Sequence, residues 1–275
     1  MDFATDQIIK NALIEDIGTG DITTISAVPE NLESTGRIIA KESGIDCGTQ
    51  IAKRTFELVG DNIKFEILKK DGESVVKGDI IAKLYGNARS LLTGERTALN
   101  FMQRLSGIAT LTAKTVNAVK GTKAKICDTR KTAPGLRILE KYAVKTGGGS
   151  NHRFNLSDGI LIKDNHIKAA GGIKQAVDCV RKTAPHTLKI EVETENMDMI
   201  AEALAVGADI IMLDNMSVQQ MEQAVKLIGG KAISEASGNM GDKDLLSIAK
   251  TGVDLISIGA LTHSAKALDI SLKFD

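Results

Sequence analysis

Cationic side chains are concentrated in one part of an otherwise neutral sequence. The 275-residue chain carries 35 basic and 35 acidic residues, so its formal net charge is zero. Between Lys123 and Lys168, however, there are ten Lys and Arg but only four Asp and Glu, a local excess of six positive charges. Overall neutrality argues against a general nucleic-acid binder. The local basic block suggests a small anionic ligand, with a solvated basic surface as the alternative.

Two segments of this block offer donors for carboxylate or phosphate. Arg130 and Lys131 follow an apolar run, and a guanidinium can grip either anion with two parallel hydrogen bonds. Farther along, GGGSNHR (147–153) joins three glycines to His152 and Arg153. Glycines let backbone N–H groups approach an anion closely, so we expect this segment to be a second anion-binding loop.

Charged residues also occur within or at the end of apolar runs. Lys163 lies in ILIKDNHI, where alternation gives it one face of a strand. Glu191 and Glu193 are two residues apart and share a face, and Asp214 ends the next run. Carboxylates at adjacent strand ends suit Mg²⁺, ribose hydroxyls or an interior lysine. A structural Lys–Glu pair is the alternative for Glu191, and His166 is interpreted as a loop or capping residue.

Two loops near the end of the chain have the composition of a phosphate site. EASGNMG (235–241) and SIGALTHS (257–264) each join small residues to a predicted helix. Backbone N–H groups at helix N-termini bind phosphate, and His263 adds a side-chain donor. With cations on the first loops and carboxylates on the middle strands, this order predicts a phosphorylated sugar and a carboxylated second substrate.

The elements that position these residues alternate regularly after Lys123. Short apolar runs separated by amphipathic helical segments predict βαβ units with parallel strands. The predicted helices are 136–145, 173–183, 197–205, 218–228 and 242–250. The predicted strands are 124–128, 159–164, 188–193, 209–214, 232–237 and 254–259. Each ends in a polar or small residue, and the chemistry of a β/α barrel lies at the C-terminal ends of its strands. A doubly wound sheet would alternate likewise, but no G-x-G-x-x-G follows the first strand.

The first 110 residues mix helices with short strands. We expect helices over 5–16 and 89–119, and strands around 36–40 and 62–68. The segment 66–86 has a strand–turn–strand–turn–strand order typical of lipoyl or biotinyl domains, which makes a carrier or binding module an alternative of another class. No lysine flanked by apolar residues stands at its DGE turn, which disfavours an attached carrier group.

The sequence also indicates the setting of the protein. Cys47, Cys127 and Cys179 lie far apart, which disfavours a disulfide framework or a zinc site and favours a reduced, cytoplasmic location. No apolar run approaches the ~18–20 residues of a membrane helix. No secretory signal is recognised at the start of the sequence. We expect no membrane or nucleic-acid partner.

At these residues the sequence closely resembles a known family, nicotinate-nucleotide pyrophosphorylase (carboxylating), also called quinolinate phosphoribosyltransferase. The resemblance covers almost the whole chain. The matching stretches are EDIGTGDIT (15–23), GERTALNFMQRLSGIAT (94–110), DTRKTAPGLR (128–137), EKYAVKTGGGSNHRFNLSDGILIKDNHI (140–167), IEVE (190–193), IIMLDN (210–215), EASGN (235–239) and ISIGALTHSAKALDISL (256–272). It implies an α/β fold: an N-terminal α/β sandwich over 1–112, and an open, incomplete β/α barrel over 113–264. The tail 265–275 is expected to pack back on the first domain.

The resemblance also implies a reaction. Quinolinate and phosphoribosyl pyrophosphate give nicotinate mononucleotide, pyrophosphate and CO₂ in de novo NAD biosynthesis, with Mg²⁺ as cofactor. It further implies a homodimer, or a higher multiple, whose active sites are shared between subunits. The nearest alternative is a molybdenum-transport-associated pyrophosphorylase-like paralogue acting on another substrate.

The family's functional residues carry over position by position. Its quinolinate-binding cations correspond to Arg130, Arg153 and Lys163, with Arg96 supplied by the partner subunit. Lys131 and His152 match basic residues near quinolinate and pyrophosphate. Glu193 and Asp214 match the acids near the ribose hydroxyls and Mg²⁺. The resemblance implies that these two acids hold the Mg²⁺ ion, either directly or indirectly. The remaining predicted substrate-binding residues are Thr129, Ser237, Gly238, Gly259, Ala260 and His263, and the predicted catalytic residues are Lys131, Lys163, Glu193 and Asp214.

Overall fold

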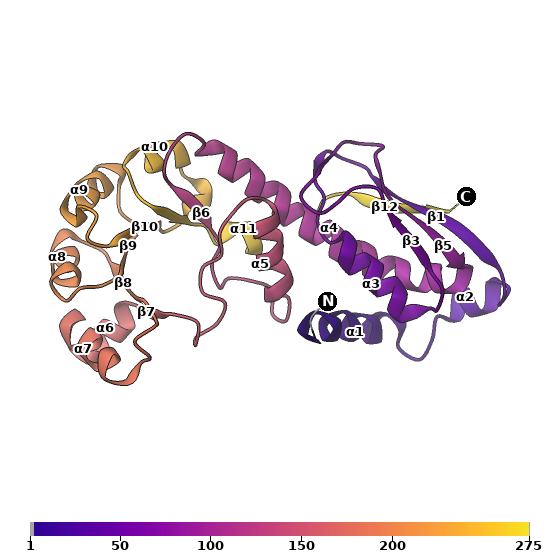
Figure 1. Cartoon of the computed structure of the whole chain (residues 1–275), viewed down its shortest axis with the longest axis horizontal. Coiled ribbons are helices and arrows are strands. Elements are labelled where there is room, and N and C mark those ends of the chain that lie inside the picture. The colour runs from indigo at the N-terminus through magenta and orange to yellow at the C-terminus, as the bar shows by residue number, and fades with distance from the viewer. Residues whose placement is uncertain (1–2, 275) are drawn as a thin grey trace. The chain divides into compact units, whose positions relative to one another are not determined.

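The computed structural model describes residues 3–274 and divides into two compact units, which are described separately (Figure 1). The first unit holds the chain up to Ala113, the segment Ala133–Gly148, and the chain from Ala265. The second holds Lys114–Thr132 and Gly149–Ser264. The C-terminal segment is therefore grouped with the first unit.

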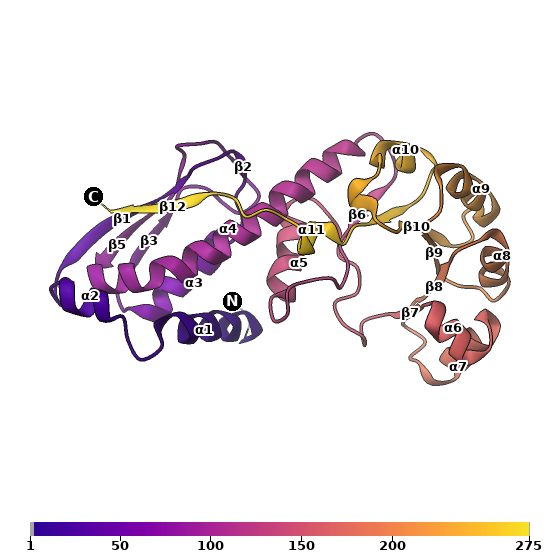
Figure 2. The same ribbon diagram turned by 180° about the vertical axis from the view of Figure 1, so that it is seen from behind.

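An antiparallel sheet with helices on one face forms the first unit (Figures 1 and 2). Its strand order is β12-β1-β5-β3, with β1 at Glu33–Ala40, β3 at Lys64–Ile67, β5 at Ile80–Asn87 and β12 at Ile270–Phe274. The helices are α1 (Phe3–Ile17), α2 (Ile22–Ala27), α3 (Thr49–Val59) and α4 (Ala88–Ala118). Alternate strand residues such as Ile38 and Leu84 are buried against Phe56 of α3 and Met102 of α4. This layered arrangement is the expected α/β sandwich.

The segment 66–86 does not form the successive hairpins typical of a lipoyl domain. Its middle strand, β4 (Ser74–Val75), pairs with β2 (Gly44–Ile45), while β3 pairs directly with β5. The predicted strand order is therefore present, but the middle strand lies outside the sheet formed by the other two.

Helix α5 (Arg137–Thr146) belongs to the first unit, although the expected boundary assigned it to the barrel domain. Its buried Glu140 accepts a hydrogen bond from Arg104 Nε of α4 at 2.7 Å. Gly147, which ends α5, lies so close to α4 that a Cβ atom would stand 2.4 Å from the Ala109 carbonyl oxygen. The first glycine of GGGSNHR thus allows helix packing.

The second unit is a six-stranded parallel sheet with helices on its outer side (Figure 1). The strand order is β6-β11-β10-β9-β8-β7. Their bounds are Lys125–Cys127 for β6, Ile160–Ile162 for β7, Ile190–Thr194 for β8, Ile210–Asp214 for β9, Ile233–Ser237 for β10 and Leu255–Ser257 for β11. Among the described residues β6 and β7 are edge strands that do not pair with each other, so the expected open β/α barrel is confirmed.

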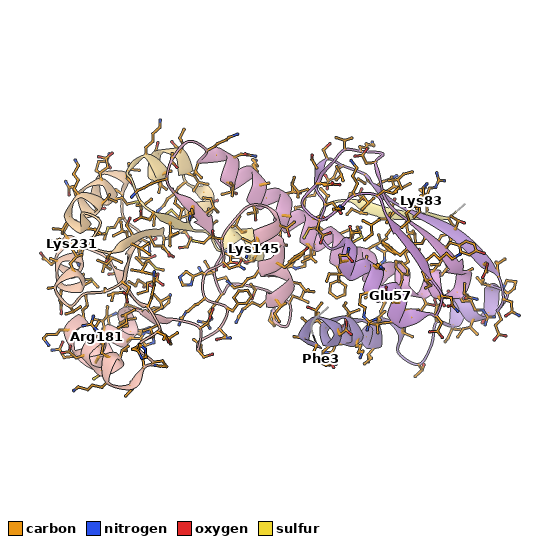
Figure 3. The ribbon with its side chains drawn as sticks, viewed as in Figure 1. Phe3, Glu57, Lys83, Lys145, Arg181 and Lys231 are labelled. Atoms are coloured by element: carbon orange, nitrogen blue, oxygen red, sulfur yellow. The ribbon has the colours of Figure 1, made fainter. Side chains whose placement is uncertain are left out.

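The helices that follow the barrel strands differ in how well they match the predicted periodicity. They are α6 (Asp164–Ala170), α7 (Ile173–Thr183), α8 (Met197–Ala205), α9 (Val218–Ile228), α10 (Leu245–Lys250) and α11 (Ala260–His263). Helices α7, α8 and α9 match the expected segments residue for residue. Asn196 and Ser217 cap α8 and α9 by accepting backbone N–H bonds, which explains their sharp starts. Charged side chains such as Arg181 project from these helices (Figure 3).

No helix of residues 3–274 is both long and apolar enough to cross a membrane. The three cysteines are free, with Cys47 and Cys127 buried and Cys179 exposed.

Candidate active site

A cavity of about 740 Å³ lies at the C-terminal ends of the barrel strands, within the second unit. Every substrate-binding residue expected from this chain's own barrel lines it. These residues are Thr129, Arg130, Lys131, His152, Arg153, Lys163, Glu193, Asp214, Ser237, Gly238, Gly259, Ala260 and His263. Arg96 lies elsewhere, exposed on α4 in the first unit.

The cationic side of the cavity is built by the loops after β6 and before β7. Thr129 Oγ1 accepts a 3.0 Å hydrogen bond from the Lys131 backbone N–H, which fixes the first loop. Arg153 Nη1 donates to the Gly159 carbonyl at 2.8 Å. Burial, and next the charge of Arg130, lowers the pKa of Arg153. Two half-buried cations that repel each other favour an anion between them.

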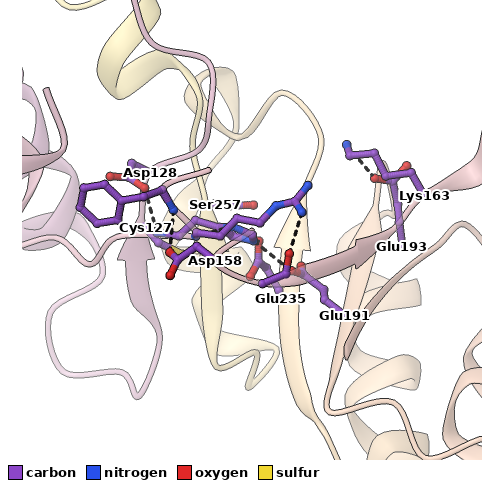
Figure 4. Close-up of polar contacts among 12 residues, drawn as sticks. Cys127, Asp128, Asp158, Lys163, Glu191, Glu193, Glu235 and Ser257 are labelled. Carbon is purple, nitrogen blue, oxygen red and sulfur yellow. Dashed lines mark hydrogen bonds and ion pairs between the residues drawn. The ribbon is translucent and has the colours of Figure 1, made fainter. Parts of the chain in front are cut away.

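Lys163 follows β7 and reaches across to β8 (Figure 4). Its Nζ stands 3.2 Å from Glu193 Oε2, with the lysine side chain about half exposed and the carboxylate largely buried. The interior Lys–Glu pair therefore involves Glu193 instead of Glu191. His166 Nδ1 accepts the Lys163 backbone N–H at 2.9 Å, so the interpretation of His166 as a capping residue is confirmed.

The acidic side of the cavity adjoins the first of the two predicted phosphate loops, residues 235–241. Asn215 Nδ2 donates to Asp214 Oδ2 at 2.6 Å, and the Asn215 backbone N–H donates to the Ser237 carbonyl at 3.1 Å. Gly238 has a φ of +96°, and a Cβ atom there would stand 2.2 Å from Asn215 Oδ1. Only glycine fits this position, so the backbone of the loop can turn into the cavity.

The second phosphate loop is packed as closely. A Cβ atom on Gly259 would stand 2.9 Å from Lys131 Cδ and 3.2 Å from the His263 ring. The Thr262 hydroxyl donates to the Lys131 carbonyl at 2.7 Å, which ties this loop to the first cationic loop. His263 Nδ1 lies 2.6 Å from Ser264 Oγ. The two loops thus bring Lys131 and His263 to one end of the cavity.

The floor of the cavity contains a residue that sequence reasoning missed, Glu235 of β10. His152 Nε2 lies 3.0 Å from Glu191 Oε2 and 3.7 Å from Glu235 Oε1. Burial, and next the negative charge of Glu191, raises the pKa of Glu235 to about 7. Strand alternation was a usable signal, because Glu235 is two residues before Ser237 and shares its face.

Other lining residues were not singled out from the sequence, although Asn239, Met240, Gly241, Ser257 and Ser264 lie in the two predicted phosphate loops. The residues not singled out are Leu161, Met212, Asn215, Asn239, Met240, Gly241, Asp242, Ser257 and Ser264. The glycine triplet, in contrast, does not line this cavity. Gly147 instead permits the close contact between α5 and α4.

Comparison with known sequences identifies both parts of the chain. Residues 21–106 match the quinolinate phosphoribosyl transferase N-terminal domain, and residues 108–273 match the C-terminal domain of the same family. The chain is 48% identical over 266 residues to the probable nicotinate-nucleotide pyrophosphorylase [carboxylating] of Bacillus subtilis, covering 97% of this chain and 92% of the relative. A Synechocystis protein of the same name is 45% identical over 271 residues, with 98% and 92% covered.

Solved structures agree with the sequence comparison. The nicotinate-nucleotide pyrophosphorylase from Francisella tularensis superposes with a TM-score of 0.94 at 44% identity, covering 99% of this chain and 96% of that one. The protein of that name from Ehrlichia chaffeensis gives 0.95 at 42% identity, covering 100% and 99%. The chain belongs to the quinolinate phosphoribosyltransferase family.

Proposed function

We propose that this chain converts quinolinate and phosphoribosyl pyrophosphate into nicotinate mononucleotide, pyrophosphate and CO₂, a step of NAD biosynthesis. One observation carries the assignment. A single cavity has a cationic side, two carboxylates on neighbouring strands and two glycine-containing loops. The relatives named for this activity match the chain almost from end to end. The three cysteines form no disulfide, which fits the proposed cytoplasmic setting.

Quinolinate is assigned to the cationic side of the cavity, which the loops after β6 and before β7 form. The substrate carries two carboxylates on adjacent ring carbons, so holding it in one orientation requires several fixed positive charges. Arg130 and Arg153 suit this role because guanidinium groups bind carboxylates through paired hydrogen bonds. Lys163 is assigned to the same substrate, with Glu193 holding its ammonium group in position.

Phosphoribosyl pyrophosphate is assigned to the opposite side. The 5-phosphate would lie between the loops of Gly238 and Gly259, where missing side chains expose backbone N–H groups. Ser237, Ala260 and His263 line the same region. The hydrogen bonds to the ribose hydroxyls are assigned to Glu193 and Asp214, and neutralisation of the leaving pyrophosphate is assigned to Lys131.

Glu193 and Asp214 are also suitable ligands for Mg²⁺. Both carboxylates border the cavity, and Mg²⁺ is commonly bound by one or two carboxylates together with substrate phosphates. The ion would supply positive charge to the pyrophosphate as it leaves. Lys163 already contacts Glu193 and Asn215 contacts Asp214, which favours an ion held mainly by the substrate.

The reaction then depends on how the two substrates are positioned and does not require a nucleophile from the protein. The ring nitrogen of quinolinate attacks the ribose carbon as pyrophosphate departs, and fixed cations stabilise the charge that develops on the leaving group. The ring nitrogen becomes positive once bonded to ribose. It can therefore accept the electron pair released when the neighbouring carboxylate leaves as CO₂.

We also propose a homodimer, or a multiple of one, in which Arg96 contributes to the partner's cavity. Large apolar side chains on α1 and α2 are exposed, with Phe3 98%, Ile14 69%, Ile22 77% and Ile25 55% accessible. Exposed apolar clusters of this kind mark interaction surfaces. Arg96 is exposed on α4 of the same unit, where a partner subunit can reach it.

The assignment is tested by incubating the purified chain with quinolinate, phosphoribosyl pyrophosphate and Mg²⁺. We expect equal amounts of CO₂, pyrophosphate and nicotinate mononucleotide. A folded protein that releases no CO₂ but transfers phosphoribose to another ring acid would identify a paralogue with a different second substrate.

A further inference from the structure

The proposed reaction needs a proton. The arginine and lysine side chains on the cationic side of the cavity are poor donors of it. Loss of CO₂ leaves an electron pair on ring carbon 2, and the product carries hydrogen at that position. Arg130 and Arg153 hold their protons too strongly to serve as acids. Lys163 has its ammonium group against Glu193. A neutral acid at the cavity wall would fill this role.

His152, Glu191 and Glu235 form a cluster of titratable side chains at the floor of the cavity. Figure 4 shows Glu191 and Glu235. His152 Nδ1 accepts the Arg153 backbone N–H at 2.8 Å, so its own ring proton resides on Nε2. That Nε2–H points to Glu191 Oε2 at 3.0 Å and is 3.7 Å from Glu235 Oε1. The imidazole therefore bonds Glu191 and leaves Glu235 just beyond hydrogen-bond distance.

The surroundings of Glu235 favour a protonated carboxyl. Its side chain is fully buried, and its polar neighbours include His152 Nε2, 3.7 Å from Oε1, and the Ser257 hydroxyl, whose effect on the pKa is smaller than that of burial. The titratable groups beside it are Glu191 of β8 and His152, while β9 and β11 place Met212 and Ser257 next to it. If Glu235 were ionised, it and Glu191 would place two negative charges in one buried site. That arrangement has a much higher free energy than one in which Glu235 keeps its proton.

A second cavity of about 430 Å³ lies on the other side of this floor. It is lined by residues at the starts of strands, including Ile160, Ile210 and Leu255, so it lies toward the N-terminal end of the barrel. Glu235 and His152 border both cavities. This volume is large enough for several water molecules, which could exchange protons with Glu235 without entering the substrate cavity.

We propose that Glu235 is the acid that protonates ring carbon 2 of the product, and that the second cavity returns a proton to it after each turnover. This inference rests on the proposed function. The bond between carbon 2 and its carboxylate breaks, and CO₂ leaves without the bonding electrons. That electron pair takes the proton from the Glu235 carboxyl, which becomes a carboxylate. Water in the second cavity then returns one proton, which restores the starting state.

The test compares Glu235→Gln with Glu222→Gln, a matched change on exposed α9. Glutamine keeps the shape of the carboxyl but cannot act as the acid. In a single turnover we expect Glu235→Gln to release pyrophosphate within about threefold of the control rate. Formation of nicotinate mononucleotide should fall by about 100-fold, the usual contribution of a general acid. The carboxylated mononucleotide should accumulate and be visible by mass spectrometry.

The pH dependence provides a readout that a structural role would not change. In the unaltered chain, product formation should decline as the pH rises through about 7, because Glu235 then loses its proton. In Glu235→Gln the slow residual step should lack this decline. The Glu235 carboxyl carbon, followed by ¹³C NMR, should titrate in the same range.

Two results would overturn this role. If Glu235→Gln forms nicotinate mononucleotide as fast as the control, the proton comes from solvent. If pyrophosphate release and product formation fall together with an unchanged pH profile, Glu235 only supports the fold of the floor. Absence of any turnover by the unaltered chain would overturn the proposed function itself, and the role of Glu235 with it.

Discussion

Single residues at the cavity are sorted by charge according to the strand that carries them. Arg130 and Arg153 come from the loops around β6 and β7, whereas Glu193 and Asp214 end β8 and β9. Parallel strands deliver their C-terminal ends to the same edge of the sheet, and β8 and β9 are neighbours in sheet order, which brings Glu193 and Asp214 together. Strands β6 and β7 are opposite edges, and the segment before Arg153 is held beside β6 by the bridge between Cys127 and Ser150. The cavity thus has a cationic region and a separate acidic region.

Arg153 should bind quinolinate more than the sugar phosphate. Replacing Arg153 with Ala removes a charged hydrogen-bond donor, worth about 1.5–3 kcal/mol, or roughly ten- to hundredfold in the KM for quinolinate. The KM for phosphoribosyl pyrophosphate should change by less than about threefold in steady-state assays. Lys182→Ala, on exposed α7, controls for the loss of one positive charge. Equal weakening of both substrates would reassign Arg153 to the phosphates.

Asp46 should make the stability of the first unit depend on pH. Its carboxyl is fully buried and accepts the Thr49 hydroxyl at 2.6 Å; burial raises its pKa from 3.8 to about 7. The folded chain thus favours the protonated form. This contribution to stability is complete below pH 3.8 and is lost as the pH rises through about 7, up to about 4 kcal/mol.

The substitution Asp46→Asn keeps an acceptor for Thr49 but cannot ionise. We expect its free energy of unfolding, measured with denaturant, to change less between pH 5 and pH 8 than that of the unaltered chain. Asp61→Asn, at an exposed turn, should leave the pH dependence as it was. If Asp46→Asn and the unaltered chain lose stability in parallel over this range, the buried carboxyl is not the source.

Elements differ in how well the sequence predicts them. Helices α7, α8 and α9 were predicted because each has an apolar stripe of helical period, and α8 and α9 also begin at a capping side chain. The short helix α6 was missed because it buries no residue and therefore has no such stripe. The pairing of β4 with β2 depends on contacts between distant residues, which local patterns do not report.

The residues of the candidate site also differ in how well the sequence predicts them. Charged residues at strand ends, such as Lys163 and Asp214, were predicted because polarity is unexpected on an apolar run. The partner of Lys163 was not predicted, since which carboxylate it meets depends on the register of β7 against β8. Gly147 was misassigned because a glycine that permits helix packing has the same sequence signature as one that admits an anion.

The C-terminal strand depends on a close approach at Gly107 of α4. A Cβ atom there would stand 2.1 Å from the Lys266 carbonyl oxygen, just before β12 pairs with β1. Gly107→Ala should therefore destabilise the chain by about 1–2 kcal/mol, because the overpacking cost exceeds the helix preference of alanine. Thermal unfolding and amide exchange of Ile270 and Leu272 would report the loss. Asn100→Ala, at an exposed position of α4, should not lower the stability. Equal stability of the two variants would contradict the prediction.

At the scale of the whole molecule, the proposed assembly explains why Arg96 and the barrel cavity occur in different units. A chain that supplies Arg96 to its partner and receives the partner's Arg96 in return forms two equivalent sites. Such reciprocal contacts are the usual consequence of two-fold symmetry. The apolar residues exposed on α1 and α2 would then be buried in the assembly.

Mixing two inactive variants tests this sharing directly. Arg96→Ala and Lys163→Ala should each lose most activity as pure proteins. In a mixed dimer, one site combines an intact barrel with an intact partner Arg96, while the other site carries both defects. Activity should therefore reappear after subunit exchange, reaching about one quarter of that of the unaltered protein, because half of the dimers are mixed and each has one intact site. Native mass spectrometry would verify the exchange, and mixed dimers that remain inactive would show that Arg96 does not act across the interface.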